Sequence, residues 1–126
     1  MSLFGDMSDA RADDRVWKAL ADATRRQVVD LLCVEPRTTG ELCAAFPELG
    51  RTSVMKHLDV LEEANLLLVR REGRRRWNYY NPIPIQEIHE RWVSRHVAQR
   101  AQGLLALRRA AEHHSGNPTN PRRKPR

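Results

Sequence analysis

A short amphipathic pattern that leads without a linker into an arginine-rich hairpin is the feature that most constrains how this chain can fold. Between residues 51 and 64, Val54, Leu58 and Leu61 are spaced by four and three, which predicts a helix with one buried face. Asn65 follows at the position where helices often end in a left-handed residue, a conformation that Asn tolerates after Gly. The pattern therefore predicts a helix that ends sharply before the next element.

The segment that follows has the pattern of a β-hairpin. Residues 66–71 form an apolar strand candidate, Glu72-Gly73-Arg74 a turn, and residues 75–80 a second strand rich in aromatic side chains. Five arginines stand against one glutamate between residues 66 and 81, so the hairpin carries a concentrated positive charge. Such a charge attracts polyanions, and nucleic acid is the commonest of these partners. The alternative is an edge pair of strands whose charges only prevent aggregation.

Three shorter helical patterns precede this helix, and they begin near Asp13, Asp22 and Thr38. Asp13 or Asp14 is the expected N-cap of the first pattern. Thr38 and Glu41 have the spacing of a capping box at the start of the third. The side chains expected to face inward in these three helices are Val16, Trp17, Leu20, Ala21, Val28, Val29, Leu31, Leu32, Leu42, Cys43 and Phe46.

A last helical pattern extends over residues 85–113. Its 29 residues would form a helix about 43 Å long, which exceeds what the core of a 126-residue chain can cover. The apolar stripe is therefore predicted to pack against a second copy of the chain, although its beginning could instead cover the first helix of its own chain. The expected interface residues are Trp92, Val93, Val97, Ala101 and Leu104.

Length and composition predict one domain with two unstructured ends. Residues 1–12 are expected to be a flexible arm, residues 13–115 the folded domain, and residues 116–126, which are rich in Pro, Asn and basic residues, a disordered basic tail. The sequence has no run of 18 apolar residues and no secretory signal pattern, so we expect a cytoplasmic protein without a membrane partner. The expected fold class is mainly α with a small β-hairpin.

Two short helices joined by a tight turn and followed by a basic hairpin form a winged helix-turn-helix. A helix fits the major groove of double-stranded DNA, and a basic hairpin beside it can reach the backbone or the minor groove. Small hydroxyls can meet phosphates or base edges, Lys56 can reach a guanine or a phosphate, and Met55 could contact a thymine methyl group. The residues predicted to face DNA are Arg51, Thr52, Ser53, Met55, Lys56, His57, Arg74, Arg75 and Arg76.

These residues resemble the ArsR/SmtB-type winged-helix transcriptional regulators. The resemblance covers roughly residues 14–97 and depends on four segments, VWKALADATRRQVVDLL, TTGELCAAF, SVMKHLDVLEEANLL and VRREGRRRWNYYNP. It implies a homodimeric, sequence-specific repressor of an operator, whose affinity for DNA is lowered by a small effector or a modification. It also implies that Thr52, Ser53, Met55, Lys56 and His57 occupy the DNA-facing positions of the family helix.

The metal sites of this family are incomplete in the sequence. The third-helix site needs two thiolates two residues apart, and here only Cys43 is present. In the last-helix site, Glu87 and His89 match the first two ligands, but Arg100 and Gly103 stand where the other two belong. We therefore expect no metal and no other cofactor.

The remaining expectations concern the cysteines and the competing functions. Cys33 and Cys43 are expected to be small core residues, with a redox switch as the alternative. No catalytic motif is recognisable, so an enzyme is not expected. The competing function is a nucleic-acid-binding module without sequence specificity, either architectural or RNA-binding, which would bind operator and random duplex almost equally.

Overall fold

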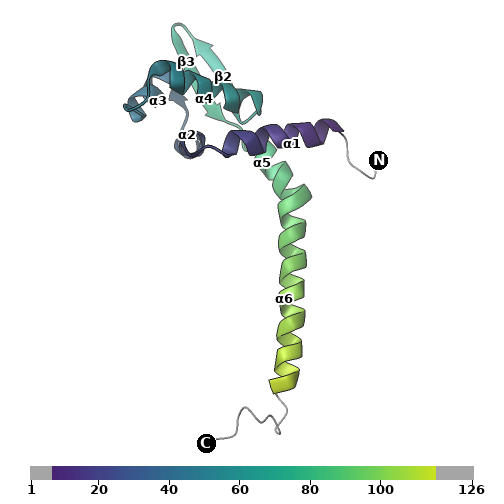
Figure 1. The fold of residues 1–126 in the computed structure, drawn as a ribbon. Helices are drawn as coiled ribbons and strands as arrows, with labels where there is room; N and C mark the ends of the chain where they lie inside the picture. The colour runs from purple at the N-terminus through teal and green to yellow at the C-terminus, as the bar shows by residue number, and fades with distance from the viewer. Residues whose placement is uncertain (1–6, 116–126) are drawn as a thin grey trace, which may run out of the picture. The chain divides into compact units, whose positions relative to one another are not determined.

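The computed structural model describes residues 7–115, which divide into two units between Ile88 and His89. In the first unit, helices α1 to α4 precede a β-hairpin, and a short helix follows it (Figure 1). The elements of this unit are α1 (Met7–Leu20), α2 (Ala23–Val34), β1 (Arg37–Thr38), α3 (Thr39–Ala45), α4 (Arg51–Glu63), β2 (Leu67–Glu72), β3 (Arg75–Tyr80) and α5 (Ile83–Ile88). This is a winged helix-turn-helix, as the sequence predicts.

Helix α1 begins earlier than the apolar pattern indicates. It starts at Met7, so the prediction of a flexible arm is wrong for residues 7–12 and Asp13 is not the N-cap. Ala10, Arg11 and Ala12 have good helix propensity and are exposed, so they extend the helix without adding to its buried face. That face holds Val16 and Ala19, whereas Trp17, which we expected to be buried, remains 46% exposed. The first six residues of the predicted arm lie outside the described part of the chain.

Helices α2 and α3 begin at side-chain caps. Asp22 Oδ1 accepts a hydrogen bond from the backbone N–H of Arg25 at 3.1 Å. At α3, Thr38 Oγ1 accepts from the backbone N–H of Glu41 at 3.1 Å, and Glu41 Oε1 accepts from the backbone N–H of Thr38 at 2.8 Å. The predicted capping box is therefore confirmed, and it determines where the first helix of the helix-turn-helix begins.

The sheet has a third strand that the sequence pattern did not predict. Strand β1 pairs antiparallel with β3, so the strand order is β1-β3-β2. Asn78 on β3 is fully buried, and its Nδ2 donates to the Arg37 carbonyl at 3.2 Å and to Thr39 Oγ1 at 3.1 Å. These hydrogen bonds join the hairpin to the beginning of α3, so the wing and the helix-turn-helix share one framework.

Helix α4 matches its prediction closely. Its bounds are Arg51–Glu63, and the three predicted apolar residues, Val54, Leu58 and Leu61, are all buried. Asn65 has φ +62°, the left-handed conformation expected at the helix end. The buried apolar residues of this unit form its core around α4, and they are Val16, Ala19, Val28, Val29, Leu32, Leu42, Phe46, Val54, Leu58, Leu61, Ala64, Leu66, Leu67 and Ile88.

Replacing Asn65 tests this sharp helix end. The change Asn65→Ala should lower the free energy of unfolding by about 1 to 2 kcal/mol, because a side chain other than Asn or Gly is strained at positive φ. The change Asn65→Gly is the matched control and should cost little, because Gly adopts this conformation freely. Urea denaturation of both variants measures the difference, and an equal stability of the two would contradict a conformational role for Asn65.

The second unit contains η1 (His89–Val93), a π-helical segment, and α6 (Ser94–Ser115). The prediction placed one helix over residues 85–113, whereas helical structure begins at Ile83 and includes a π-helical turn. The earlier start is possible because Pro84 lies in the first turn of α5, where a missing N–H costs no helical hydrogen bond. No helix within residues 7–115 has the length and apolar character of a membrane span. The predicted basic tail, residues 116–126, lies outside the described residues.

Candidate nucleic-acid interface

The exposed side of α4 begins at its first residue. The N-cap, Gly50, supplies no side chain to cap the amides of the first turn. Arg51, Thr52 and Ser53 are exposed there, and Lys56 is exposed one turn later. Because the amides and the dipole at a helix N-terminus favour anions, this end of α4 suits contact with phosphates or base edges. Four of the predicted residues are therefore accessible at one end of the helix.

Two other residues of α4 are less accessible than the pattern predicts. Met55 is half-buried, and its Sδ lies 3.7 Å from Arg76 Nη1. His57 is also half-buried, and its Nδ1 lies 3.1 Å from Arg25 Nη1. Both side chains therefore contact other elements of their own unit, which leaves them less free to meet a base than Lys56.

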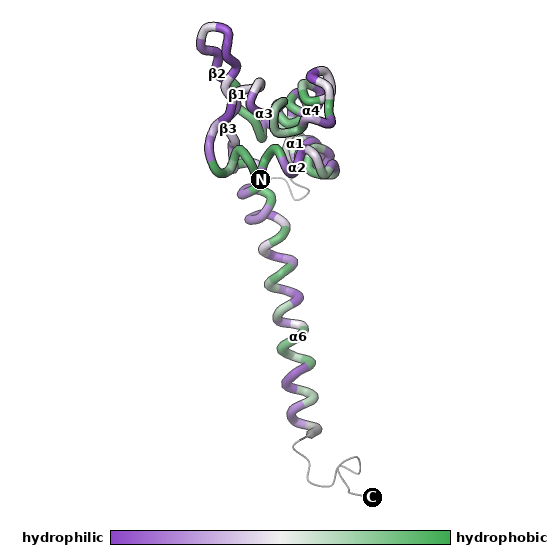
Figure 2. The backbone as a smooth tube through the Cα atoms, turned by 90° about the vertical axis from the view of Figure 1, so that its left-hand side faces the viewer, coloured by the Kyte–Doolittle hydropathy of each residue, from purple (hydrophilic) through white to green (hydrophobic). Residues whose placement is uncertain are grey.

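The hairpin ends in a two-residue turn that presents arginine. Glu72 pairs with Arg75, so Gly73 and Arg74 form the turn. Gly73 has φ +60° and Arg74 does not have positive φ, which is the pattern of a type II′ turn. Figure 2 shows the end of the hairpin in the purple of hydrophilic residues. Arg74 and Arg75 are exposed there, as predicted, and Arg71 on the facing strand is exposed as well.

A hollow lies between the wing and the start of α4. Its volume is about 310 Å³, and its lining combines arginines of the hairpin with Arg51 and Met55 of α4 and with residues at the start of α3. Among the described residues, no acidic side chain lines it, so its charge favours a polyanion. The residues around this hollow, which we call the arginine groove, are Thr38, Thr39, Gly40, Arg51, Met55, Arg71, Arg74, Arg75 and Arg76.

The arginine groove includes Arg71, which the sequence prediction did not select. The signal for it lies in the register of the hairpin. Arg71 is the cross-strand partner of Arg76, so the two side chains lie on the same face, whereas Arg70 lies on the other. A pairing scheme for the strands was needed to distinguish these two adjacent arginines.

Arg76 departs most from its prediction. We expected its guanidinium to reach DNA, but only 9% of the residue is exposed. Its Nη2 donates to Glu62 Oε1 at 3.1 Å, an ion pair between β3 and the last turn of α4. The guanidinium therefore binds within the protein and does not project toward DNA, because a buried arginine is stable only when its charge is paired.

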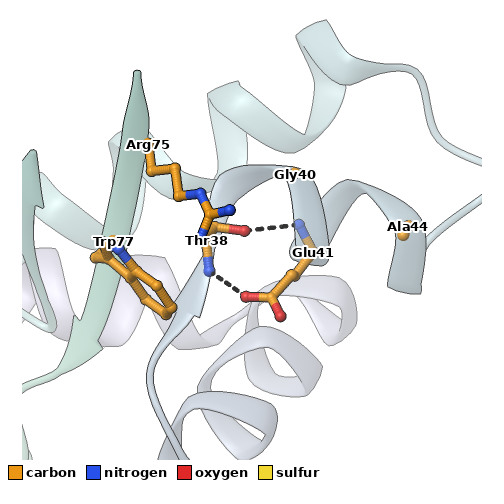
Figure 3. A pocket seen from close by; sticks show the side chains of 6 residues that line it. All are labelled: Thr38, Gly40, Glu41, Ala44, Arg75 and Trp77. Atoms are coloured by element: carbon orange, nitrogen blue, oxygen red, sulfur yellow. Dashed lines mark hydrogen bonds between the residues drawn. The ribbon is translucent and has the colours of Figure 1, made fainter. Parts of the chain in front are cut away.

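A second hollow lies beside β3 and the start of α3, and Figure 3 shows its lining. Its volume is about 430 Å³, and it is lined by Thr38, Gly40, Glu41, Ala44, Arg75 and Trp77. Hydrogen bonds from Thr38, and to a smaller extent the charges of Arg37 and Arg75, hold the pKa of Glu41 below its ordinary value of 4.5. This acid is therefore ionised at neutral pH, and its charge makes the second hollow less suited to phosphates than the arginine groove.

Arg25 of α2 contacts α4 through His57, and the sequence prediction did not select it. Its Nε donates to the Ala19 carbonyl at 2.7 Å and its Nη2 to the Lys18 carbonyl at 3.2 Å, near the end of α1. The same guanidinium reaches His57 on α4. A single side chain of α2 thus connects three helices, and only the folded arrangement reveals that connection.

The cap that holds Arg25 in place should make stability depend on pH. The hydrogen bond from the Arg25 backbone N–H, supported by the nearby charges of Arg25 and His57, holds the pKa of Asp22 below its ordinary value of 3.8. Its stabilising effect is therefore complete above about pH 3.8 and is lost as the pH falls through the lower folded-state pKa. The change Asp22→Asn keeps a cap without the charge, so the advantage of the wild type over it should shrink below that pH. Thermal melts of both proteins from pH 6 to pH 2 measure this, and a constant difference would contradict the cap.

The predicted interface residues in the second unit are mostly exposed. Trp92, Val97, Ala101 and Leu104 are exposed and Val93 is half-buried, with Val97 reaching 61%. Leu105 and Leu107 of α6 are also exposed apolar side chains. The exposed apolar side chains of α6 are compatible with a protein partner.

The two cysteines do not share one environment. Cys43 is half-buried, but Cys33 is exposed, so the prediction of a core role is wrong for Cys33. The buried residues of α2 are Val28, Val29 and Leu32, so Cys33 lies at the edge of the buried face, near the end of the helix. Within the described residues, no three His, Cys, Asp or Glu side chains come together as a metal site would require.

Comparison with known proteins agrees with this fold. A family described as a helix-turn-helix domain matches residues 20–70. The HTH-type transcriptional regulator Rv2034 of Mycobacterium tuberculosis is 43% identical over 76 residues, which are 60% of this chain and 70% of the relative. A crystal structure of an ArsR family transcriptional regulator aligns with a TM-score of 0.66 at 28% identity, over 73% of this chain and 93% of that one.

A solution structure from Mycobacterium bovis is also similar. It is described as a homodimeric winged helix-turn-helix DNA-binding domain of a possible ArsR-family transcriptional regulator. It aligns with a TM-score of 0.58 at 26% identity, over 81% of this chain and 94% of that one. Fold and relatives thus define a winged helix-turn-helix transcriptional regulator. Among these regulators, the chain belongs to the ArsR family.

Proposed function

We propose that this protein is a homodimeric repressor that recognises an inverted repeat in double-stranded DNA. Helix α4 would enter the major groove with its N-terminal end, and the turn of the β2–β3 hairpin would contact the adjacent backbone or minor groove. The observation that carries this proposal is the arginine groove, which joins the uncapped start of α4 to the wing. Repression and a small effector follow from the family resemblance and stay predictions.

The division of charge between the two elements supports sequence recognition. The wing supplies the cations Arg71, Arg74 and Arg75, which suit phosphates of any sequence. The accessible part of α4 carries Thr52, Ser53 and Lys56, which can donate or accept hydrogen bonds at base edges. Charge on the wing would therefore give affinity, and α4 would give specificity.

The dimer proposal depends on the second unit and on a relative. Leu104, Leu105 and Leu107 place exposed apolar surface on a helix of 22 residues. The similar domain from Mycobacterium bovis is described as homodimeric. A two-fold dimer would present two α4 helices about one DNA turn apart. Analytical ultracentrifugation at micromolar concentration should show a dimer, and a monomer would refute this part.

Selection of bound duplexes from a random pool tests the proposed function. The selected sequences should converge on an inverted repeat whose half-sites are centred about 10 base pairs apart. A pool that does not converge would favour the competing module without sequence specificity. The selected repeat, called the operator below, also supplies the ligand for the binding measurements.

Two adjacent arginines of β2 provide a matched test of the arginine groove. The change Arg71→Ala should weaken operator and random duplex alike and reduce the slope of log affinity against log salt by about one, because one phosphate contact is lost. The change Arg70→Ala removes the same charge from the opposite face and should leave that slope nearly unchanged. Fluorescence anisotropy at several salt concentrations measures both, and equal effects would place the contact elsewhere.

A further inference from the structure

The Arg76 side chain connects the wing to two different turns of α4. Glu62, its partner at 3.1 Å, lies in the last turn of α4. Met55, whose Sδ lies 3.7 Å from Arg76 Nη1, is seven residues earlier. Seven residues are about two helical turns and about 10 Å, so these two side chains lie on one stripe of α4. One guanidinium of β3 therefore contacts two side chains whose backbone positions are about 10 Å apart on the helix.

Two contacts restrict the movement of α4 relative to the hairpin more than a single contact would. A single contact would allow α4 to tilt or rotate relative to the hairpin, whereas Met55 and Glu62 together oppose both movements. The burial of Arg76 strengthens this restriction, because separating a buried charge from its partner would leave that charge uncompensated. Glu62 itself is 48% exposed, so the arginine of the pair is shielded from water and the glutamate remains partly accessible to it.

The arrangement that Arg76 maintains between α4 and the hairpin includes the groups proposed to contact DNA. Arg71 is the cross-strand partner of Arg76, and both line the arginine groove with Arg51. A change in how Arg76 holds α4 would alter the distance between the wing cations and Lys56. Base hydrogen bonds need donors in place to within a few tenths of an ångström, whereas attraction to phosphates tolerates larger displacements.

We infer that Arg76, through Glu62 and Met55, is a positioning residue for sequence discrimination, which sets the spacing between the base-reading end of α4 and the phosphate-binding wing. Arg76 does not contact DNA itself, and Met55 packs on the guanidinium instead of reading a thymine methyl group. This inference rests on the proposed function, because it concerns how the proposed DNA surface is held.

The test compares two adjacent glutamates. The changes Glu62→Ala and Glu63→Ala each remove one negative charge from the last turn of α4, but only Glu62 holds Arg76. Removing an acid increases the net positive charge, which by itself would strengthen binding to any DNA. The inference predicts the opposite for Glu62→Ala on the operator, a loss of about tenfold in affinity, equivalent to about 1.4 kcal/mol. Random-duplex affinity should rise by the same small factor, no more than about twofold, in Glu62→Ala and Glu63→Ala, because the two variants have the same net charge.

A variant of the arginine distinguishes positioning from direct contact. If Arg76 met a phosphate, Arg76→Gln would weaken random-duplex binding and lower the salt slope by about one. As a positioning residue, it should lower operator affinity about tenfold and leave the salt slope for random duplex unchanged. The double variant with Glu62→Ala should be no worse than the more severe single variant, because both remove one interaction.

The outcomes separate this inference from the proposed function. Circular dichroism and thermal melting confirm that each variant is folded at the temperature of the binding assay, and Glu62→Gln replaces Glu62→Ala if the latter does not fold. Discrimination lost in Glu62→Ala but kept in Glu63→Ala supports the inference. Equal discrimination in the two variants, or equal weakening of operator and random duplex, overturns it. A wild-type protein that does not discriminate overturns the proposed function itself.

Discussion

Replacing Leu58 by alanine is expected to lower the free energy of unfolding by about 2 to 5 kcal/mol, because the change leaves a cavity in a well-packed core. Leu58 is 0% exposed and lies at the centre of the buried face of α4. Domains of this size are stable by only about 5 to 15 kcal/mol, so this change removes a large part of the total. Guanidinium chloride denaturation followed by circular dichroism measures the loss.

Leu68→Ala is the control for this prediction. Leu68 lies on β2 and is 49% exposed, so its truncation removes little buried surface and opens no cavity. We expect a loss of less than about 1 kcal/mol. Comparable losses in the two variants would mean that the buried face of α4 does not anchor the fold.

Lys56→Ala is expected to have the largest effect of any single substitution on operator binding. The side chain is exposed on α4, one turn beyond the first residues of the helix. If it donates to a base edge, its loss should cost about 1 to 3 kcal/mol on the operator and relax the preference at one base pair. Titration of the variant with the operator and with single-base substitutions of it measures both effects.

Random duplex provides the internal control for Lys56. A lysine that meets only a phosphate would weaken operator and random duplex by similar factors and reduce the salt slope by about one. A lysine that reads a base would leave random-duplex binding nearly unchanged. Unchanged binding to both DNAs would remove Lys56 from the interface.

The parts of the fold that the sequence predicts correctly are those with local signals. The 3.6-residue period locates the buried face of α4, and the left-handed Asn65 marks its end. Thr38 and Glu41 make the predicted capping box because that motif depends only on residues three apart. The hairpin strands lie within one residue of their predicted bounds, since the turn needs Gly73.

The errors in the fold arise where burial and pairing are not local. The apolar pattern cannot show that α1 continues back to Met7, because the added residues 10–12 are exposed and carry no apolar period. Strand β1 has two residues, too few for any period, and it exists because β3 offers a free edge. Buried Asn78 was a usable signal, because asparagine is rare within strands unless its amide has partners.

The candidate site was predicted in composition but not in geometry. Arg51, Lys56 and Arg74 are accessible as expected. Arg76 is buried because its guanidinium reaches Met55 and Glu62 of α4, and Glu62 is 14 residues away in sequence. Strand register and helix packing together decide which arginine reaches solvent, and neither is visible in the local pattern.

Whether this protein reads sequence in double-stranded DNA is measured by the ratio of two affinities. The affinities for the selected operator and for a scrambled duplex of the same composition are measured by anisotropy at one physiological salt concentration. Sequence-specific recognition predicts that the operator binds at least about 10³-fold more tightly. A ratio near one, with a steep salt dependence for both duplexes, would contradict it and leave only electrostatic binding by the arginines.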